Sequence, residues 1–152
     1  MQDKMSRTRD NRLRTSVGFA LVRAFRRINR TSNRVLAPFG ISAEQGHVLL
    51  VLWFEGARRI GELQRVLTLS SGTLTGAIDR MEREGLVKRS TDATDGRSFV
   101  VEAGEMDSSR RRSIEEAIDG IESRCFAALT ARERRELLRL LEKVALPDDI
   151  TG

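Results

Sequence analysis

Residues 70–100, SSGTLTGAIDRMEREGLVKRSTDATDGRSFV, contain the pattern that decides the fold. Ser70 is a candidate N-cap, and apolar residues after it recur at the spacing of a helix with one buried face: Leu74, Ala77, Ile78 and Met81. Gly85 ends this helix. Two segments rich in β-branched or aromatic residues follow: Leu86 to Arg89 and Ser98 to Glu102. The Asp95-Gly96 pair between them favours a tight turn, so the stretch predicts a helix followed by a two-stranded hairpin.

Two shorter helices precede this stretch. Ser42 begins the first, because its hydroxyl can cap free backbone N–H groups while Gln45 reaches back as in a capping box, and the helix ends near Gly56. The second runs roughly from Ile60 to Leu67. Three short helices followed by a two-stranded β wing are the order of a winged helix-turn-helix, whose third helix lies in the DNA major groove.

Amphipathic helices flank this middle segment at both ends. Between Asn11 and about Val35 apolar residues recur at steps of three and four, and Pro38 ends the helix. Beyond Gly104 two more striped helices follow, the second opened by a capping box of Thr130 and Glu133. These helices have more apolar surface than a small domain can cover, which indicates a homodimer. We therefore predict a mainly α fold in three parts: an N-terminal dimerisation helix in residues 1–38, a winged helix-turn-helix domain in 39–103 and C-terminal dimerisation helices in 104–152.

Composition limits the classes of function. Apolar residues make up 39% of the 152 residues and charged residues 32%, which is typical of a soluble, helix-rich protein. The longest apolar run, Val48 to Phe54, is too short to cross a bilayer, and the N-terminus leads into no apolar signal segment. We therefore expect a cytoplasmic protein without a membrane partner.

The residues also argue against metal and catalytic chemistry. One histidine and one cysteine leave no cluster for a metal ion and no disulfide framework. Because no nucleophile–base pair can be argued and no phosphate loop is present, we predict that the protein is not an enzyme and uses no cofactor. Cys125 continues an apolar stripe, which favours a buried structural thiol over a redox sensor.

The net charge of +5 is unevenly distributed. Residues 1–38 contain ten Lys or Arg and two Asp or Glu, residues 39–102 contain eight and nine, and residues 103–152 contain nine and eleven. A basic protein favours a nucleic-acid partner. The excess of positive charge, however, lies outside the helix that begins at Ser70, which is the predicted reading helix. The basic side of the first helix can bind DNA phosphates or an anionic effector, or it can face acidic groups in the C-terminal helices: Glu115, Glu116, Asp119 and Glu122.

The helix that begins at Ser70 has an outer face suited to DNA. Its free N–H groups and positive dipole end attract phosphate, and its small side chains allow the backbone to approach the duplex. The candidate DNA-binding residues on this face are Ser71, Gly72, Thr73, Thr75, Gly76 and Arg80. The threonines can bond phosphates or base edges, and Arg80 can reach a guanine or a phosphate. An ordinary capped surface helix is the alternative.

The predicted hairpin adds a second element. The turn leaves Arg97 at or beside the tip, from which a guanidinium can enter a narrow minor groove. Asp92 or Asp95 can pair with Arg89 or Arg97 and so fix the direction of the arginine. A solvated turn with an incidental surface ion pair is the alternative.

Three segments together resemble the MarR family of bacterial transcription regulators: ISAEQGHVLLVLW, RIGELQRVLTLSSGTLTGAIDRMEREGLVKR and DATDGR. The resemblance covers residues 41–101, and its specific part runs from Leu69 to Arg97. It implies a dimeric repressor on a pseudo-palindromic operator, with Ser71 to Gly76 and Arg80 in the major groove and Arg97 in the minor groove. The chain departs from the family pattern at Gln64, where an alanine is frequent, and at Gly76, where many relatives carry a larger, often basic residue.

The resemblance also implies a place for a small effector. In relatives the helix that corresponds to the one beginning at Ser42 borders a crevice where small, often aromatic acids bind and release the operator. His47 and Trp53 lie on this helix and are therefore candidates for a ligand pocket, and a packed or surface histidine is the alternative.

The sequence as a whole predicts a homodimeric, DNA-binding transcriptional regulator, a repressor that a small aromatic or acidic effector can release. Two other readings stay open. One is a winged-helix protein-interaction module or anti-repressor, which the nearly neutral middle segment would suit. The other is a small helical protein that binds an acidic metabolite through the arginines of the first helix.

Overall fold

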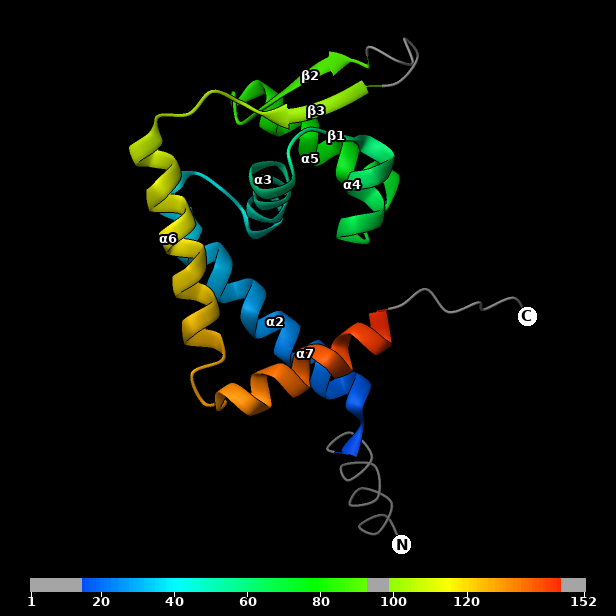
Figure 1. Ribbon diagram of the computed structural model, residues 1–152, viewed down its shortest axis with the longest axis vertical. Coiled ribbons are helices and arrows are strands. Elements are labelled where there is room, and N and C mark those ends of the chain that lie inside the picture. The colour runs from blue at the N-terminus through cyan, green and yellow to red at the C-terminus, as the bar shows by residue number, and fades with distance from the viewer. Residues whose placement is uncertain (1–14, 93–98, 146–152) are drawn as a thin grey trace, which may run out of the picture.

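The computed structural model describes residues 15–92 and 99–145. Figure 1 shows a small domain of helices and strands at one end, from which two long helices lead to a last helix at the other. The elements in chain order are α2 (Val17–Leu36), the 3-10 turn η1 (Ala37–Phe39), α3 (Ala43–Glu55), β1 (Arg58–Arg59), α4 (Ile60–Leu67), α5 (Ser71–Arg83), β2 (Val87–Thr91), β3 (Phe99–Ala103), α6 (Ser108–Cys125) and α7 (Ala131–Ala145).

The predicted helix caps are confirmed. The Ser42 hydroxyl accepts a hydrogen bond from the Gln45 N–H at 3.2 Å, and the Gln45 side chain accepts from the Ser42 N–H at 2.8 Å, which completes the capping box of α3. Thr130 and Glu133 form the corresponding box before α7. The first helix differs from its predicted bounds, because α2 begins after an N-cap at Ser16. The predicted start near Asn11 lies outside the described residues.

The sheet has three strands in the order β1-β3-β2, where the sequence predicted a two-stranded wing. The additional strand, β1, consists of two residues that pair antiparallel with Val100 and Val101 of β3. Two exposed or half-buried arginines have no alternating apolar pattern, so nothing in the sequence identified this strand. The predicted turn at Asp95-Gly96 lies outside the described residues.

The core lies where α3, α4, α5 and the sheet meet. The predicted inner face of α5, from Leu74 to Met81, is fully buried there. α6 adds Ile114 and Ile121 to the same cluster, which joins the long helix to the small domain. The core cluster consists of Leu36, Ile41, Val48, Leu49, Leu52, Leu63, Leu74, Ile78, Met81, Leu86, Val87, Val101, Ile114 and Ile121.

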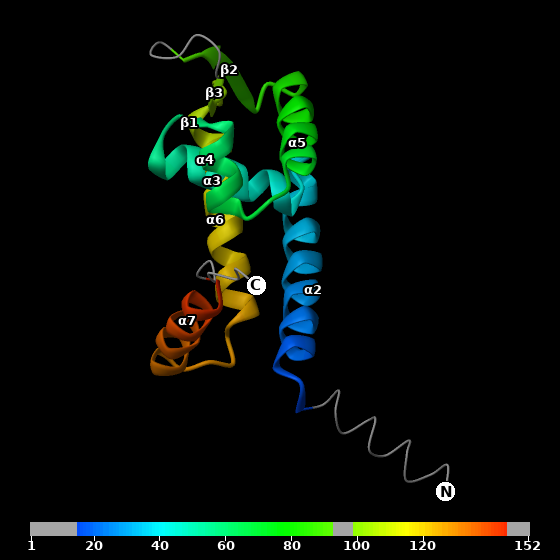
Figure 2. The ribbon, with the colours of Figure 1, turned by 90° about the vertical axis from the view of Figure 1, so that its right-hand side faces the viewer.

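α2 packs along α6, as Figure 2 shows, but much of its apolar surface is uncovered within one chain. Val17 is 80% exposed and Phe25 63%, and on α7 Leu138 is 59% and Val144 70% exposed. Cys125, at the end of α6, is half-buried against the core cluster and forms no disulfide. The described part of the chain therefore has a well-packed small domain and unpartnered apolar faces on its terminal helices.

No single helix within the described ranges is long and apolar enough to span a bilayer. The segments Val17–Phe39 and Ala43–Glu55 reach that length and composition only when taken together, and they are bent by 76° at the break between them.

Gly85, which follows α5, and Gly104, which follows β3, lie in close contact. The Gly104 N–H donates to the Leu86 carbonyl at 2.8 Å. A Cβ atom on Gly104 would lie 2.1 Å from the carbonyl oxygen of Gly85, whose φ of +72° places it in the left-handed region that ends α5. The sheet can therefore close over the helix only if residue 104 has no side chain.

We expect Gly104→Ala to lower the free energy of unfolding by about 1–3 kcal/mol, because its methyl group must displace backbone atoms. Gly120→Ala is the matched control, since a Cβ there meets open space on α6 and alanine favours a helix. Urea unfolding of both variants at one protein concentration measures the difference. Equal stability of the two variants would contradict the close approach.

Candidate nucleic-acid interface

The outer face of α5 is largely exposed in the described part of the chain. Ser71, Gly72, Thr73, Thr75 and Arg80 are exposed, whereas Gly76 is half-buried. A Cβ on Gly76 would lie 3.6 Å from a guanidinium nitrogen of Arg80, which is an ordinary van der Waals contact, so the Arg80 side chain lies beside this glycine. The structure thus brings together on one surface all six residues predicted for the major groove.

The first turn of α5 is capped by the Ser70 side chain. The Ser70 hydroxyl accepts from the Thr73 N–H at 3.3 Å, and the two side-chain oxygens of these residues are 2.8 Å apart. The turn contains no acidic residue, so no carboxylate of its own competes for its other N–H groups. The free N–H groups at this helix end can donate hydrogen bonds to a phosphate oxygen.

Arg89 connects the wing to α5. Its Nη2 is 2.6 Å from an Asp79 carboxylate oxygen, and its Nη1 is 3.2 Å from one of Glu82. The predicted pairing of Arg89 with Asp92 is therefore wrong, and the predicted pairings that involve Asp95 or Arg97 lie outside the described residues. Arg89 lies on the same side of β2 as the buried Val87, so its side chain points toward α5 rather than along the hairpin.

Asp92 instead binds Arg59. The Arg59 Nε donates to the Asp92 carboxylate at 2.6 Å, and the Asp92 side chain is only 9% exposed. This contact joins the end of β2 to β1, the strand that the sequence did not reveal. The remaining wing residues of the prediction, Asp95 and Arg97, lie outside the described residues.

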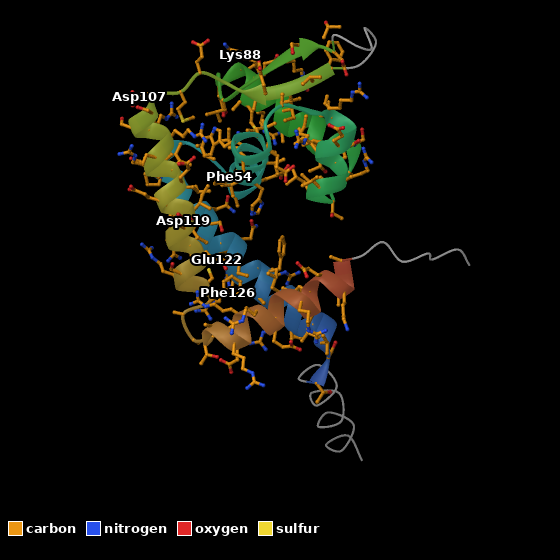
Figure 3. The ribbon with its side chains drawn as sticks, viewed as in Figure 1. Phe54, Lys88, Asp107, Asp119, Glu122 and Phe126 are labelled. Atoms are coloured by element: carbon orange, nitrogen blue, oxygen red, sulfur yellow. The ribbon has the colours of Figure 1, made fainter. Side chains whose placement is uncertain are left out.

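An exposed ion pair and a helix cap lie between β2 and the start of α6. Lys88, on the solvent side of β2, is 2.7 Å from Glu105 (Figure 3), and this hydrogen bond raises the pKa of Lys88 and lowers that of Glu105. Asp107 caps α6, and the hydrogen bonds that it accepts from the Ser109 hydroxyl and from backbone N–H groups lower its pKa. Both acidic groups stay ionised around neutral pH.

A polar contact joins α3 to the end of α5. The Gln45 side chain, which is almost buried, donates from Nε2 to a Glu84 carboxylate oxygen at 3.1 Å. The Asn33 side chain of α2 accepts from the Ala43 N–H at 2.9 Å at the start of the same α3. α3 is thus tied to the long helix on one side and to the candidate reading helix on the other.

A cavity of about 170 Å³ lies between α2, α3 and α6. Of the two residues predicted for a ligand pocket, His47 lines this cavity and Trp53 does not. The two residues are six positions apart on α3 and therefore face different directions. The Trp53 ring instead lies 5.1 Å from the Arg111 guanidinium of α6. The sequence did not identify Ser32 and Glu122 as lining residues, because the pocket forms only when the three helices pack.

The arginines of α2 have no acidic partner on α6. Glu115 pairs at 2.9 Å with Arg111 of its own helix. In the described part of one chain, no ion pair links α6 to the exposed arginines of α2: Arg23, Arg26, Arg27, Arg30 and Arg34. The predicted neutralisation of these arginines by α6 therefore does not occur within one chain.

Known proteins resemble this chain both in the segment that contains α5 and over most of its length. A model of the MarR family matches residues 41–99, which include α3, α4, α5 and β2 and end at the first residue of β3. The HTH-type transcriptional regulator MgrA of Staphylococcus aureus is 31% identical over 133 residues, which cover 87% of this chain and 89% of MgrA. The chain belongs to the MarR family. It is a MarR-type transcriptional regulator, and the predicted family is confirmed.

Two solved structures support the predicted winged helix fold. A point mutant of Escherichia coli MarR, complexed with operator DNA, is 27% identical with a TM-score of 0.73, over 86% of this chain and 94% of that one. BpsR of Bordetella bronchiseptica, whose DNA binding is regulated by 6-hydroxynicotinic acid, is 26% identical with a TM-score of 0.76, over 88% and 96% of the two chains.

We expect Arg89→Met to lower the free energy of unfolding by about 1–2 kcal/mol, because two charged hydrogen bonds are lost while the aliphatic stem remains. Lys88→Met, on the solvent side of the same strand, should change it little. Urea unfolding measures both. In a double-mutant cycle, Asp79→Asn should lower the free energy of unfolding less in the Arg89→Met background than in the wild type. Strictly additive effects would show that the Arg89–Asp79 contact contributes nothing to stability.

Proposed function

We propose that this MarR-family regulator binds a pseudo-palindromic operator as a homodimer and represses transcription. The observation that carries the proposal is the non-acidic first turn of α5, capped only by Ser70, on an exposed face with Arg80. Such a helix end enters the major groove in helix-turn-helix proteins. E. coli MarR, which shares the fold, was solved with operator DNA.

Each residue has a role in this proposal. The backbone around Ser71 and Gly72 holds phosphate, Thr73 and Thr75 contact phosphate or base edges, and Arg80 reaches a guanine or a phosphate. Arg97 enters the minor groove from the wing, an assignment that rests on the sequence alone. Arg89 and Asp92 act indirectly, because Arg89 fixes the wing against α5 and Asp92 ties it to β1.

The unpartnered apolar faces of α2 and α7 support the homodimer. A second copy is the commonest way to cover such surface, and two reading helices then contact half-sites about 10 base pairs apart. We further propose that the protein acts in the cytoplasm and that it regulates without catalysing a reaction.

The cavity beside His47 favours a second element, release by a small effector. It lies between the domain with the reading helix and the two long helices, so a molecule there contacts both parts. Regulation of BpsR by 6-hydroxynicotinic acid shows that a protein of this fold can respond to a small ligand. A winged protein-interaction module would need neither operator DNA nor this cavity.

We expect Arg80→Ala and Arg97→Ala each to weaken binding to the native upstream DNA by about tenfold or more, the range for loss of one arginine–base contact. Arg112→Ala, an exposed arginine on α6, is the control and should bind as the wild type does. Gel shifts at several salt concentrations measure the affinities, which should fall steeply with salt. Wild-type affinity in both test variants would exclude the proposed contacts and favour a protein-interaction module.

We expect Leu138→Glu to shift the protein from dimer toward monomer, because it would bury a charge in the proposed interface on α7. Val66→Glu is the matched control, since Val66 is 53% exposed on α4, in the small domain. Light scattering after size-exclusion chromatography gives the mass of each species. A dimer of unchanged stability in Leu138→Glu would place the interface elsewhere.

A further inference from the structure

The cavity between α2, α3 and α6 has mostly apolar walls. Leu36, Leu50 and Ile118 are examples, and Gly46 contributes no side chain at all. A Cβ there would lie 3.0 Å from a methyl group of Leu36, so the glycine keeps this wall open. A volume of about 170 Å³ is close to that of cavities that bind a single benzene ring, about 150 Å³. The apolar part of a ligand is thus limited to about one ring.

The polar groups of the lining mainly accept hydrogen bonds. The Ser32 hydroxyl already donates to the Ile28 carbonyl at 3.0 Å, so only its lone pairs remain for a ligand. Glu122 offers two carboxylate oxygens, and its side chain forms no hydrogen bond or ion pair with any residue in the described ranges. The His47 ring is likewise without such a partner there, and a neutral imidazole can accept on one nitrogen.

The charge of the lining is therefore negative. Neither lysine nor arginine is among the residues that form the cavity, and Glu122 is its only acidic member in the described part of the chain. The arginines of α2 line a separate groove: Arg23, Arg26, Arg27 and Arg30. A carboxylate in the cavity would face Glu122 without a lysine or an arginine, whereas an ammonium group has three donors for these acceptors.

We propose that this cavity binds a small molecule made of one apolar ring and a protonated amine, with Glu122 as the residue that selects the charge. This charge is opposite to that of the acidic effector expected from the sequence. That the amine acts as the effector rests on the proposed function, whereas the selection of the ligand by charge does not.

Three probes of similar size and different charge test the selection: benzylamine, benzyl alcohol and benzoate. Chemical-shift titration of the full-length protein gives a dissociation constant for each, even in the millimolar range. We expect benzylamine to bind about two- to fivefold more tightly than benzyl alcohol, the ratio that corresponds to an exposed ion pair, and benzoate to bind most weakly.

Glu122→Gln should remove the preference for benzylamine and leave the affinity for benzyl alcohol unchanged. Asp119→Asn is the matched control, because Asp119 lies on the same helix (Figure 3) but does not line the cavity. It should keep the preference of the wild type. Gly46→Leu, which fills the wall beside Leu36, should weaken all three probes and so locate binding in the cavity.

Benzoate that binds as tightly as benzylamine would overturn the proposal, as would a preference that survives Glu122→Gln or a lack of binding by every probe. Gel shifts without a probe separate this outcome from the proposed function. Glu122→Gln should bind operator DNA as the wild type does. If the protein binds DNA normally but shows no preference for benzylamine, only the proposed ligand class is refuted. Loss of operator binding by the wild-type protein itself would refute the proposed function.

Discussion

Burial of one face of α5 is the constraint on which the rest of the structure depends. Leu74, Ile78 and Met81 are fixed in the core between α3, α4 and the sheet, and this packing sets the rotation of the helix. Small residues on the opposite face then point outward, and the first turn is left open because only Ser70 caps it. The Arg89 contact with Asp79 holds the wing against the same helix. The packing of the core thus determines which residues of α5 form the candidate DNA-binding surface.

The sequence predicted the parts of this arrangement that depend on neighbours in the chain. The capping boxes at Ser42 and Thr130 and the buried face of α5 need only residues within one or two turns, so their patterns could be read directly. The contacts that it did not predict join distant segments. β1 forms only when it pairs with β3, Arg89 finds its partners only once β2 lies over α5, and the cavity exists only between three packed helices. The hydrophobic period and residue spacing within one segment do not reveal its contacts with distant segments.

The small domain, the outer side of α2 and the cavity beside His47 differ in charge. The small domain has a slightly negative balance, so the proposed binding of DNA depends on individually placed donors rather than on net charge. The arginines of α2 lie on another helix and have no ion-pair partner in the described part of their own chain. The cavity beside His47 has an acidic edge, although the protein as a whole is basic. Total charge is therefore a poor guide to what each site binds.

The Trp53–Arg111 contact has a practical consequence. Trp53 is the only tryptophan in a chain without tyrosine, so its indole dominates the intrinsic emission of the protein. Its ring lies on α3, under a guanidinium from α6, at the joint between the small domain and the long helices. A change in the angle between these two parts alters the surroundings of that ring. The emission of Trp53 therefore reports on the packing of α3 against α6 without a label or an engineered residue.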